Sequence, residues 1–318
     1  MTAATVPPAP PAVEPADSGV PPEPRRRRFS RRRRESFYAL ALLLPSIIVF
    51  GVFTYYPFVR TVRDGMFQTN RFRTKETYVG LEQYWDVLTS SSFHNSLEVT
   101  GLFALYTVIP GMILGLGLAL LANQRLRGIG VFRTVFSSTV ATSVAVASVM
   151  WITLLNPQIG LINYYLDTNI DLLNDPTWAL VAVSATTVWL SLGVTFIVMS
   201  AGLQSIPDDL LEAATVDGAG PWTRFRRVTF PLLSPTLLFS LVVLTINAFQ
   251  SFGQIDLLTG GGPNNRTDVI VFNIVSTSRQ APGRAAAQAV ILFVIILVLT
   301  LVQLRFLERR VYYEAGRE

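Results

Sequence analysis

The chain of 318 residues has no cysteine, one histidine and one lysine. Without cysteine it forms neither disulfides nor thiolate metal sites. His94 has no second histidine with which to share a metal ion, so we expect no metal site. Lys75 follows no glycine-rich loop, which excludes the phosphate cradle of P-loop nucleotide-binding proteins. These absences leave few residues from which an enzymatic site could be built.

Charged residues are also scarce. They make up 15% of the chain, whereas 50% of its residues are apolar and the mean hydropathy is +0.42. Soluble domains carry about 25% charged residues. The composition therefore predicts an integral membrane protein.

Apolar residues gather in six segments that are nearly free of charge. A helix needs about 20 residues to cross the roughly 30 Å of membrane hydrocarbon, and each segment has about that length. The predicted spans are residues 37–59, 99–122, 134–155, 177–203, 232–255 and 285–304. We therefore expect an all-α polytopic membrane protein with six transmembrane helices. The third span is rich in serine and threonine, so neighbouring helices shield it or it lines a wet path.

The positions of arginine and lysine predict the orientation, because cytoplasmic loops carry an excess of both. With a cytoplasmic N-terminus, the inner segments hold 18 of these residues and the outer segments hold 8. The largest cluster, residues 25–28 and 31–34, adjoins the first span. We interpret it as a topology anchor at the lipid headgroups and not as a nucleic-acid site. Both termini are expected in the cytoplasm.

The N-terminal residues 1–24 contain eight prolines and few large apolar side chains. Such a segment cannot bury enough surface to offset its chain entropy, so we expect it to be disordered. The chain then divides into a proline-rich tail with an arginine-rich cytoplasmic anchor, residues 1–36, and a transmembrane domain, residues 37–313. The transmembrane domain includes a cytoplasmic loop at about residues 204–231.

This loop has the pattern of two short helices joined at a glycine. Ser205 and Asp208 have the spacing of a capping box at the start of the first helix. Gly218 can supply the left-handed residue that ends that helix, and Pro221 suits the first turn of the second. The sequence therefore predicts a helix–glycine–helix elbow that the protein presents outside the bilayer.

The elbow resembles the EAA signature of the inner-membrane permease subunits of binding-protein-dependent ABC importers. Glu212-Ala213-Ala214 is followed by three residues and Gly218, and nine more lead to residues 228–231, Val-Thr-Phe-Pro, where the family has Ile-x-Leu-Pro. Two outer segments, YVGLEQY at 78–84 and LTGGGPNN at 258–265, resemble the sugar-type branch, which is MalF- and UgpA-like. The segment 302–313 is similar to the end of glycerol-3-phosphate (UgpA-type) permeases.

The resemblance implies a type I importer permease in the bacterial plasma membrane. It pairs the chain with a second permease subunit, two ATP-binding subunits and an extracytoplasmic solute-binding protein. ATP and Mg²⁺ would belong to the ATP-binding subunits, and this chain would hold no cofactor. Coupling to the ATPase is assigned to Glu212, Ala213, Ala214, Asp217 and Gly218. The loop that faces the binding protein is assigned to Gly260, Gly261, Gly262 and Pro263.

The predicted fifth span carries a stripe of uncharged polar residues, Asn247, Gln250, Ser251 and Gln254. These side chains either hydrogen-bond a hydroxyl-rich solute or hydrogen-bond neighbouring helices. No ionisable residue lies well within a span, which argues against the alternative of an ion-coupled carrier that works without ATPase subunits. No arginine lies within a span to meet a phosphate, so the binding protein or outer arginines such as Arg266 would recognise a charged solute. Sugars, oligosaccharides, glycerol-3-phosphate and glycerophosphodiesters all remain open as substrates.

Overall fold

A computed structural model describes residues 26–69, 76–124, 127–166 and 170–307. The predicted disordered tail and residues 308–318 lie outside the described residues. The chain divides into two units, residues 1–57 and 58–318, and each is described by itself. In the first unit, α1 (Arg26–Phe50) continues through a π-helical turn (Gly51–Tyr55) into the start of α2 (Tyr56–Asp64). The arginine-rich residues from Arg26 onward thus belong to a helix that runs into the first span.

The described part of the second unit is helical except for a small antiparallel sheet. Its strands, β1 (Phe67–Thr69) and β2 (Glu76–Tyr78), pair with Phe67 opposite Tyr78. The longer helices are α4 (Ser91–Ala122), α8 (Ala179–Gln204), α12 (Ser234–Phe249) and α15 (Pro282–Leu307). The shorter ones are α3 (Glu82–Leu88), α5 (Ile129–Ser137), α6 (Val144–Leu155), α7 (Leu161–Leu166), α9 (Asp208–Val216), α10 (Pro221–Arg224), α11 (Phe230–Leu232), α13 (Gly253–Leu258) and α14 (Ile270–Ser278).

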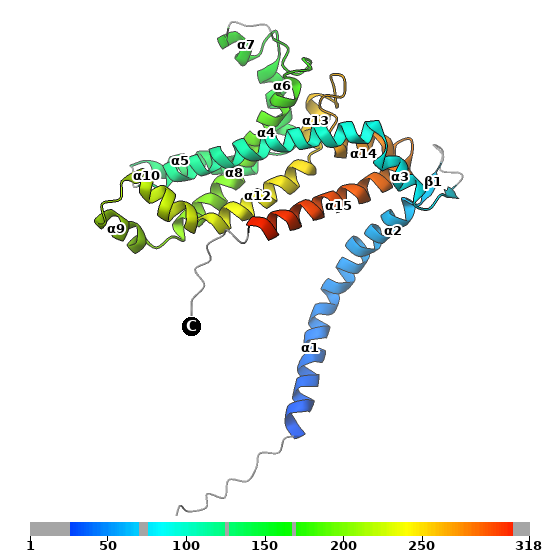
Figure 1. The fold of residues 1–318 in the computed structure, drawn as a ribbon, viewed down its shortest axis with the longest axis horizontal. Helices are drawn as coiled ribbons and strands as arrows, with labels where there is room; N and C mark the ends of the chain where they lie inside the picture. The colour runs from blue at the N-terminus through cyan, green and yellow to red at the C-terminus, as the bar shows by residue number, and fades with distance from the viewer. Residues whose placement is uncertain (1–25, 70–75, 125–126, 167–169, 308–318) are drawn as a thin grey trace, which may run out of the picture. The chain divides into compact units, whose positions relative to one another are not determined.

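The second unit is built around α4 and α8, which pack side by side (Figure 1). Helix α12 lies against both of them and against α15. One apolar core joins α4, α8 and α12 to α13, α14 and α15, and includes Phe103, Val183 and Ile270. A second core joins the far ends of α4 and α8 to Leu233, just before α12. Helices α9 and α10 lie at this second end of the bundle, and α3 and α14 lie at the other (Figure 1).

All six predicted spans correspond to candidate membrane-crossing segments. Four are single helical segments, at Tyr38–Asp64, Ser91–Ala122, Ala179–Gln204 and Pro282–Phe306. The other two are broken: Ile129–Ala141 and Val144–Leu155 meet at 106°, and Pro221–Leu232 and Ser234–Phe249 meet at 66°. The prediction of a multi-pass, all-α membrane protein is confirmed, with six crossing segments if each bent pair is counted as one span.

The third span breaks where its hydroxyl side chains cluster. Ser137 and Ser138 donate to the carbonyls of Arg133 and Val135, both at 2.7 Å, as α5 ends. A short 3₁₀ turn, Ser138–Ala141, follows, and Ser143 then caps α6 by accepting a hydrogen bond from the Val146 amide at 3.3 Å. Local side-chain partners replace helical hydrogen bonds here, so the chain can turn within an apolar segment.

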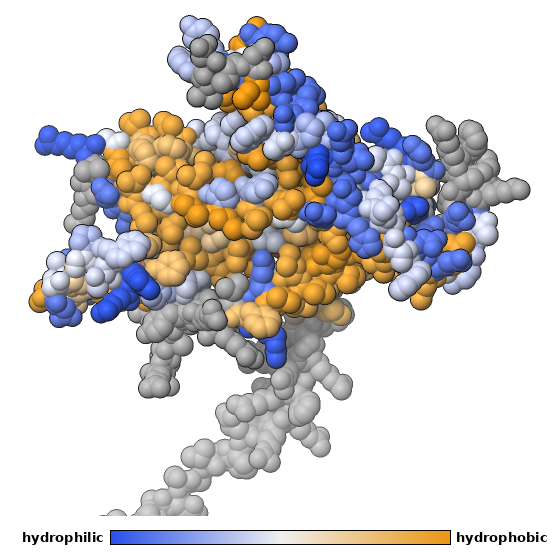
Figure 2. Space-filling view, turned by 45° about the horizontal axis from the view of Figure 1, so that its top comes forward, coloured by the Kyte–Doolittle hydropathy of each residue, from blue (hydrophilic) through white to orange (hydrophobic). Residues whose placement is uncertain are grey.

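Apolar side chains also cover much of the outside of the bundle. Figure 2 shows them gathered over its middle, with hydrophilic residues toward its ends. Ile113 on α4 and Val149 on α6 are 65% and 62% exposed. A soluble monomer rarely leaves such a large apolar surface in water. The surface therefore suits contact with lipid tails or with another membrane subunit.

Close approach of α4 and α8 depends on Gly115, and this yields a first prediction. A side chain at Gly115 would collide with the γ-methyl group of Thr195, whereas a side chain at Gly117 would meet no atom within 4 Å. We expect Gly115→Val to destabilise the chain by about 1–3 kcal/mol through overpacking. The midpoint of thermal unfolding in detergent measures this, and Gly117→Val is the matched control on the same helix. An equal loss in both variants would show that helix propensity, and not packing on α8, is responsible.

Candidate functional site

The elbow between α9 and α10 forms as the sequence predicts. Helix α9 ends in a Schellman motif, because the Gly218 amide donates to the Thr215 carbonyl and the Ala219 amide donates to the Ala214 carbonyl, both at 3.0 Å. Gly218 has φ +80°, the left-handed conformation that glycine adopts without strain. Pro221 occupies the first turn of α10. The glycine thus reverses the chain in a tight bend.

The start of the elbow differs from the predicted capping box. Pro207 stands at the N-cap position of α9, with φ −59° and ψ 131°. Ser205 lies two residues earlier, at the C-cap of α8, and its hydroxyl donates to the Gly202 carbonyl of that helix at 2.8 Å. The capping-box prediction is therefore wrong, because the proline imposes the extended conformation and Ser205 belongs to the end of α8. Asp208 and Asp209 still lie in the first turn of α9, where carboxylates favour the positive end of the helix dipole.

A side-chain brace joins the two arms of the elbow. Arg224 of α10 donates to the Thr215 hydroxyl of α9 at 3.1 Å, and that hydroxyl donates to the Leu211 carbonyl at 2.8 Å. The ring of Trp222 stacks on Phe225, with centroids 5.6 Å apart. These contacts make the elbow a defined shape that a partner can bind.

The base of the elbow is fixed in the membrane bundle. Ile206 and Leu233, which flank the elbow on either side, are buried in the second core with Ala122 of α4. A side chain at Gly202 would lie 2.7 Å from the methyl group of Thr236, so the end of α8 packs closely on the start of α12. The elbow is therefore packed onto α8 and α12 at its two ends.

The coupling residues assigned by the resemblance lie on the surface of this elbow. Glu212, Ala213, Asp217 and Gly218 are exposed and Ala214 is half-buried. Two apolar side chains not singled out from the sequence are exposed here as well: Val216 is 88% exposed and Trp222 is 70% exposed. A tryptophan in a charged loop between two spans is a signal that could have identified this surface, because exposed tryptophans often anchor protein interfaces.

A cavity of about 630 Å³ opens between α6, α8, α12 and the following helix α13. All four residues of the predicted polar stripe line it: Asn247, Gln250, Ser251 and Gln254. Helix α8 adds the hydroxyls of Thr187, Ser191 and Thr195. No lining residue is an acid, an arginine, a lysine or a histidine. The cavity combines apolar walls with uncharged hydrogen-bonding groups.

The polar stripe does not lie on one helix, contrary to the predicted fifth span. Helix α12 ends at Phe249, and Gln254 belongs to the separate helix α13. The Ser251 hydroxyl donates to the Asn247 carbonyl at 3.0 Å, which satisfies a carbonyl at the helix end. Gly253 then lets the chain pass beside α6, since a side chain there would lie 3.0 Å from a Val144 methyl group. Local hydroxyl chemistry and this close approach account for the break.

The four residues divide into two pairs at the break. Ser251 and Gln254 are buried, and the Gln254 amide donates to the hydroxyls of Ser251 and Thr187, each at 3.1 Å. This pair supports helix packing. Asn247 and Gln250 are exposed and line the cavity, so they are the members of the stripe that a solute could reach.

The glycine-rich loop after α13 has a specific backbone shape. Gly260 and Gly261 have φ +56° and +82°, and the Gly262–Pro263 peptide is cis. Gly261 is buried against the ring of Phe272, and a side chain there would collide with that ring. The exposed residues at the tip are Asn264, Asn265 and Arg266. The glycines thus shape the loop, and the tip that follows them presents polar groups.

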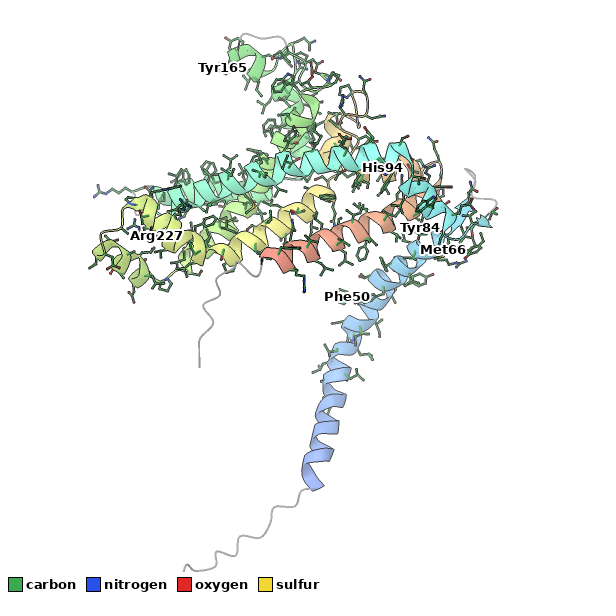
Figure 3. The ribbon with its side chains drawn as sticks, in the orientation of Figure 1. Phe50, Met66, Tyr84, His94, Tyr165 and Arg227 are labelled. Carbon is green, nitrogen blue, oxygen red and sulfur yellow. The ribbon has the colours of Figure 1, made fainter. Side chains whose placement is uncertain are left out.

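The elbow and this glycine-rich segment of the chain lie toward different ends of the bundle. Figure 3 labels Arg227 near the elbow and His94 at the start of α4, at the opposite end. The Ile270 amide of α14, just after the glycine-rich loop, donates to the Thr100 hydroxyl of α4 at 2.8 Å, which ties that loop to the His94 end.

Residues 111–312 match the family described as "Binding-protein-dependent transport system inner membrane component". The chain belongs to this family. Among curated relatives, it is 38% identical over 278 residues to the sn-glycerol-3-phosphate transport system permease protein UgpA of Agrobacterium fabrum, covering 86% of this chain and 95% of the relative. It is 33% identical over 279 residues to the trehalose/maltose transport system permease protein MalF of Thermococcus litoralis, covering 86% and 94%.

A solved structure has the same fold. A bacterial ABC transporter involved in the import of the acidic polysaccharide alginate matches with a TM-score of 0.76 and 24% identity, over 89% of this chain and 99% of that chain. A second structure that matches with a TM-score of 0.76 is of a bacterial alginate ABC transporter in complex with an alginate pentasaccharide-bound periplasmic protein. The chain is thus an ABC importer permease, a non-catalytic subunit whose partners hydrolyse ATP. The EAA signature and the elbow are consistent with this family.

Proposed function

We propose that the chain couples ATP hydrolysis to solute import across the bacterial plasma membrane, with both termini and the elbow in the cytoplasm. The observation that carries the proposal is the exposed Glu212–Gly218 elbow, whose two ends pack in the core formed with α8 and the start of α12. The excess of arginine on the elbow's side of the membrane supports its cytoplasmic location. In this arrangement the elbow docks on an ATP-binding subunit, and Gly260–Pro263 shape a loop that meets an extracytoplasmic binding protein.

The complete importer would contain a second permease subunit and two ATP-binding subunits. The apolar outer surface of this chain supports a neighbour in the membrane. Closure of the ATP-binding subunits around ATP would move the elbow and, through it, α8 and α12. Because these two helices line the cavity, their movement would open the cavity to the outside, and hydrolysis would reset it. ATP and Mg²⁺ stay with the ATP-binding subunits.

The solute is a sugar or a glycerol-phosphate-like molecule. The names of the relatives support both classes, since they include glycerol-3-phosphate and trehalose/maltose permeases. The uncharged polar lining favours recognition of hydroxyl groups by this subunit. A phosphate group binds most strongly to a cationic side chain, and the second permease or the binding protein would have to supply that side chain. The cavity volume of about 630 Å³ is in the range of small-molecule sites.

Reconstitution tests the proposed function. The chain is inserted into liposomes with the second permease, the ATP-binding subunits and the binding protein of its own importer. We expect solute uptake that requires ATP, and ATP hydrolysis that increases when the binding protein is loaded with maltose, trehalose, glycerol-3-phosphate or a glycerophosphodiester. Uptake by the chain alone, driven by an ion gradient, would overturn the proposal in favour of a secondary carrier.

The cavity gives a second prediction. Replacing Asn247 and Gln250 by alanine removes hydrogen-bonding groups that a solute can reach, and each such bond contributes about 0.5–1.5 kcal/mol. We expect the double variant, which loses two such bonds, to lower uptake about 5- to 150-fold at limiting solute while binding-protein-stimulated ATP hydrolysis is kept. Thr153→Ala on the exposed face of α6 is the control. Unchanged uptake in the double variant would remove these residues from the solute path.

A further inference from the structure

A buried carboxylate lies where the glycine-rich loop joins α14. Asp268 is 8% exposed, and no described arginine or lysine forms an ion pair with it. Burial raises the pKa of its carboxyl group, while hydrogen bonds from Asn273 and Ser96 act in the opposite direction. An unpaired buried carboxylate is costly. Its presence in this loop therefore calls for a role.

Asp268 connects three helices. One of its carboxylate oxygens accepts hydrogen bonds from the Ser96 hydroxyl of α4 and from the Asn273 amide of α14, both at 2.9 Å. The Asn273 side-chain oxygen in turn accepts a hydrogen bond from the Gln288 amide of α15 at 3.0 Å. Ser96 and Gln288 are buried as well. The carboxylate is thus the acceptor on which α4 and α14 converge.

The residue before Asp268 closes the glycine-rich loop. The Thr267 hydroxyl donates to the Gly262 carbonyl at 2.6 Å and lies 2.7 Å from the Thr259 hydroxyl. Thr267 is fully buried. The segment from Thr259 to Thr267, hereafter the outer loop, is therefore closed upon itself at its base. Asp268 fastens that base to α4 next to the Ile270–Thr100 hydrogen bond, so loss of the carboxylate would loosen the loop tip without touching the elbow or the lining of the cavity.

We propose that Asp268 is a positioning residue: by joining the base of the outer loop to α4 and α14, it holds the loop tip in the shape that receives the solute-binding protein. This inference rests on the proposed function, in which the outer loop meets that protein. The partner surface would be polar, because the tip presents Asn264, Asn265 and Arg266. Asp268 itself would stay beneath the interface.

The test uses the whole importer in nanodiscs, with ATP hydrolysis measured against the concentration of loaded binding protein. Asp268→Ala removes the acceptor that joins the Ser96 hydroxyl and the Asn273 amide at 2.9 Å, and leaves each only a longer contact with Ser92, at 3.1 Å to its carbonyl and 3.3 Å to its hydroxyl. We expect the half-saturating concentration of binding protein to rise about fivefold or more, and the maximal rate and the basal rate to stay within about twofold of wild type. Asp268→Asn keeps an acceptor and should recover most of the affinity.

A second variant keeps the test decisive if Asp268→Ala does not assemble. Ser96→Ala removes one donor to the carboxylate and should raise the half-saturating concentration in the same way, with no further rise when combined with Asp268→Asn. Ser148→Ala is the matched control, since Ser148 is equally buried but bonds only the Val144 carbonyl of its own helix.

The outcomes separate this inference from the proposed function. Wild-type half-saturation in both Asp268→Ala and Ser96→Ala would overturn the positioning role while the importer still works. A reduced maximal rate at unchanged half-saturation would also overturn it, because that result indicates general damage. A wild-type complex that no binding protein stimulates would instead overturn the proposed function on which the inference rests.

Discussion

Replacing Glu212 by lysine is expected to abolish ATP-dependent uptake without preventing insertion of the chain. Glu212 is exposed on α9, so the substitution disturbs no buried contact of this subunit. At an interface, loss or reversal of one member of a close charge pair costs about 2–5 kcal/mol. That cost corresponds to a roughly 30-fold or greater loss of coupling. Stimulated ATP hydrolysis and uptake in proteoliposomes measure the effect, and Glu212→Gln should give an intermediate value.

The control for Glu212→Lys reverses a charge at the other end of the bundle. Glu98 is exposed on α4, four residues after His94, whose position Figure 3 shows far from the elbow. Glu98→Lys makes the same change in net charge and should leave coupling near wild type. Equal losses in both variants would indicate a general effect of charge on the membrane protein. Normal uptake by Glu212→Lys would remove the coupling role from the elbow.

The elbow could be predicted in detail because its shape depends on local chemistry. A glycine that can adopt φ +80° and a proline in the first turn of the next helix specify a bend whatever surrounds them. The one local error, the capping box at Ser205, also has a local cause, since Pro207 displaces the serine from the N-cap position. The bend alone does not predict that Val216 and Trp222 are exposed, because their exposure also depends on how the elbow packs on α8 and α12; the tryptophan in a charged loop is the separate signal for this surface.

The spans show that a hydropathy pattern predicts where a helix crosses the membrane but not where it bends. Hydropathy detects a length of apolar chain, so it located all six segments, but it shows neither the 106° bend within the third nor the 66° bend at Leu233, where the fifth begins. The break in the third span had a signal, the run of serines and threonines, which was interpreted as shielding or a wet path. The break after Phe249 depends on a close approach between Gly253 and Val144. Residues more than 100 positions apart determine that geometry.

Asp268 illustrates a different limit. It lies outside every apolar segment, so the rule that ionisable residues within spans mark function does not apply to it. Its donor Ser96 is 172 residues away in the sequence, and only the fold brings them to 2.9 Å. The polar stripe is the converse case: its four residues line one cavity, while the helix that was expected to carry all of them ends at Phe249.

A second large loss of coupling is expected when the bend of the elbow is changed, and two glycines of the elbow allow a matched comparison. Gly218 has φ +80°, and a side chain there would meet no atom within 4 Å. Gly220 has equally open surroundings but φ −65°, a conformation that any residue adopts. A valine at position 218 would either adopt the left-handed conformation, which destabilises the folded chain by about 1–2 kcal/mol, or change the bend. We therefore expect Gly218→Val to reduce stimulated ATP hydrolysis and uptake about 5- to 30-fold.

Gly220→Val should stay near wild type, because position 220 precedes Pro221 and already has the extended conformation that residues before proline favour. The two variants add the same side chain to the same loop, so they differ only in backbone conformation. If both lose activity equally, the side chain collides with the ATP-binding subunit and the bend is not the cause. If neither does, the left-handed turn at Gly218 plays no part in coupling. Loss confined to Gly218→Val would show that the shape of the elbow, in addition to the charge of Glu212, carries the force from ATP hydrolysis to α8 and α12.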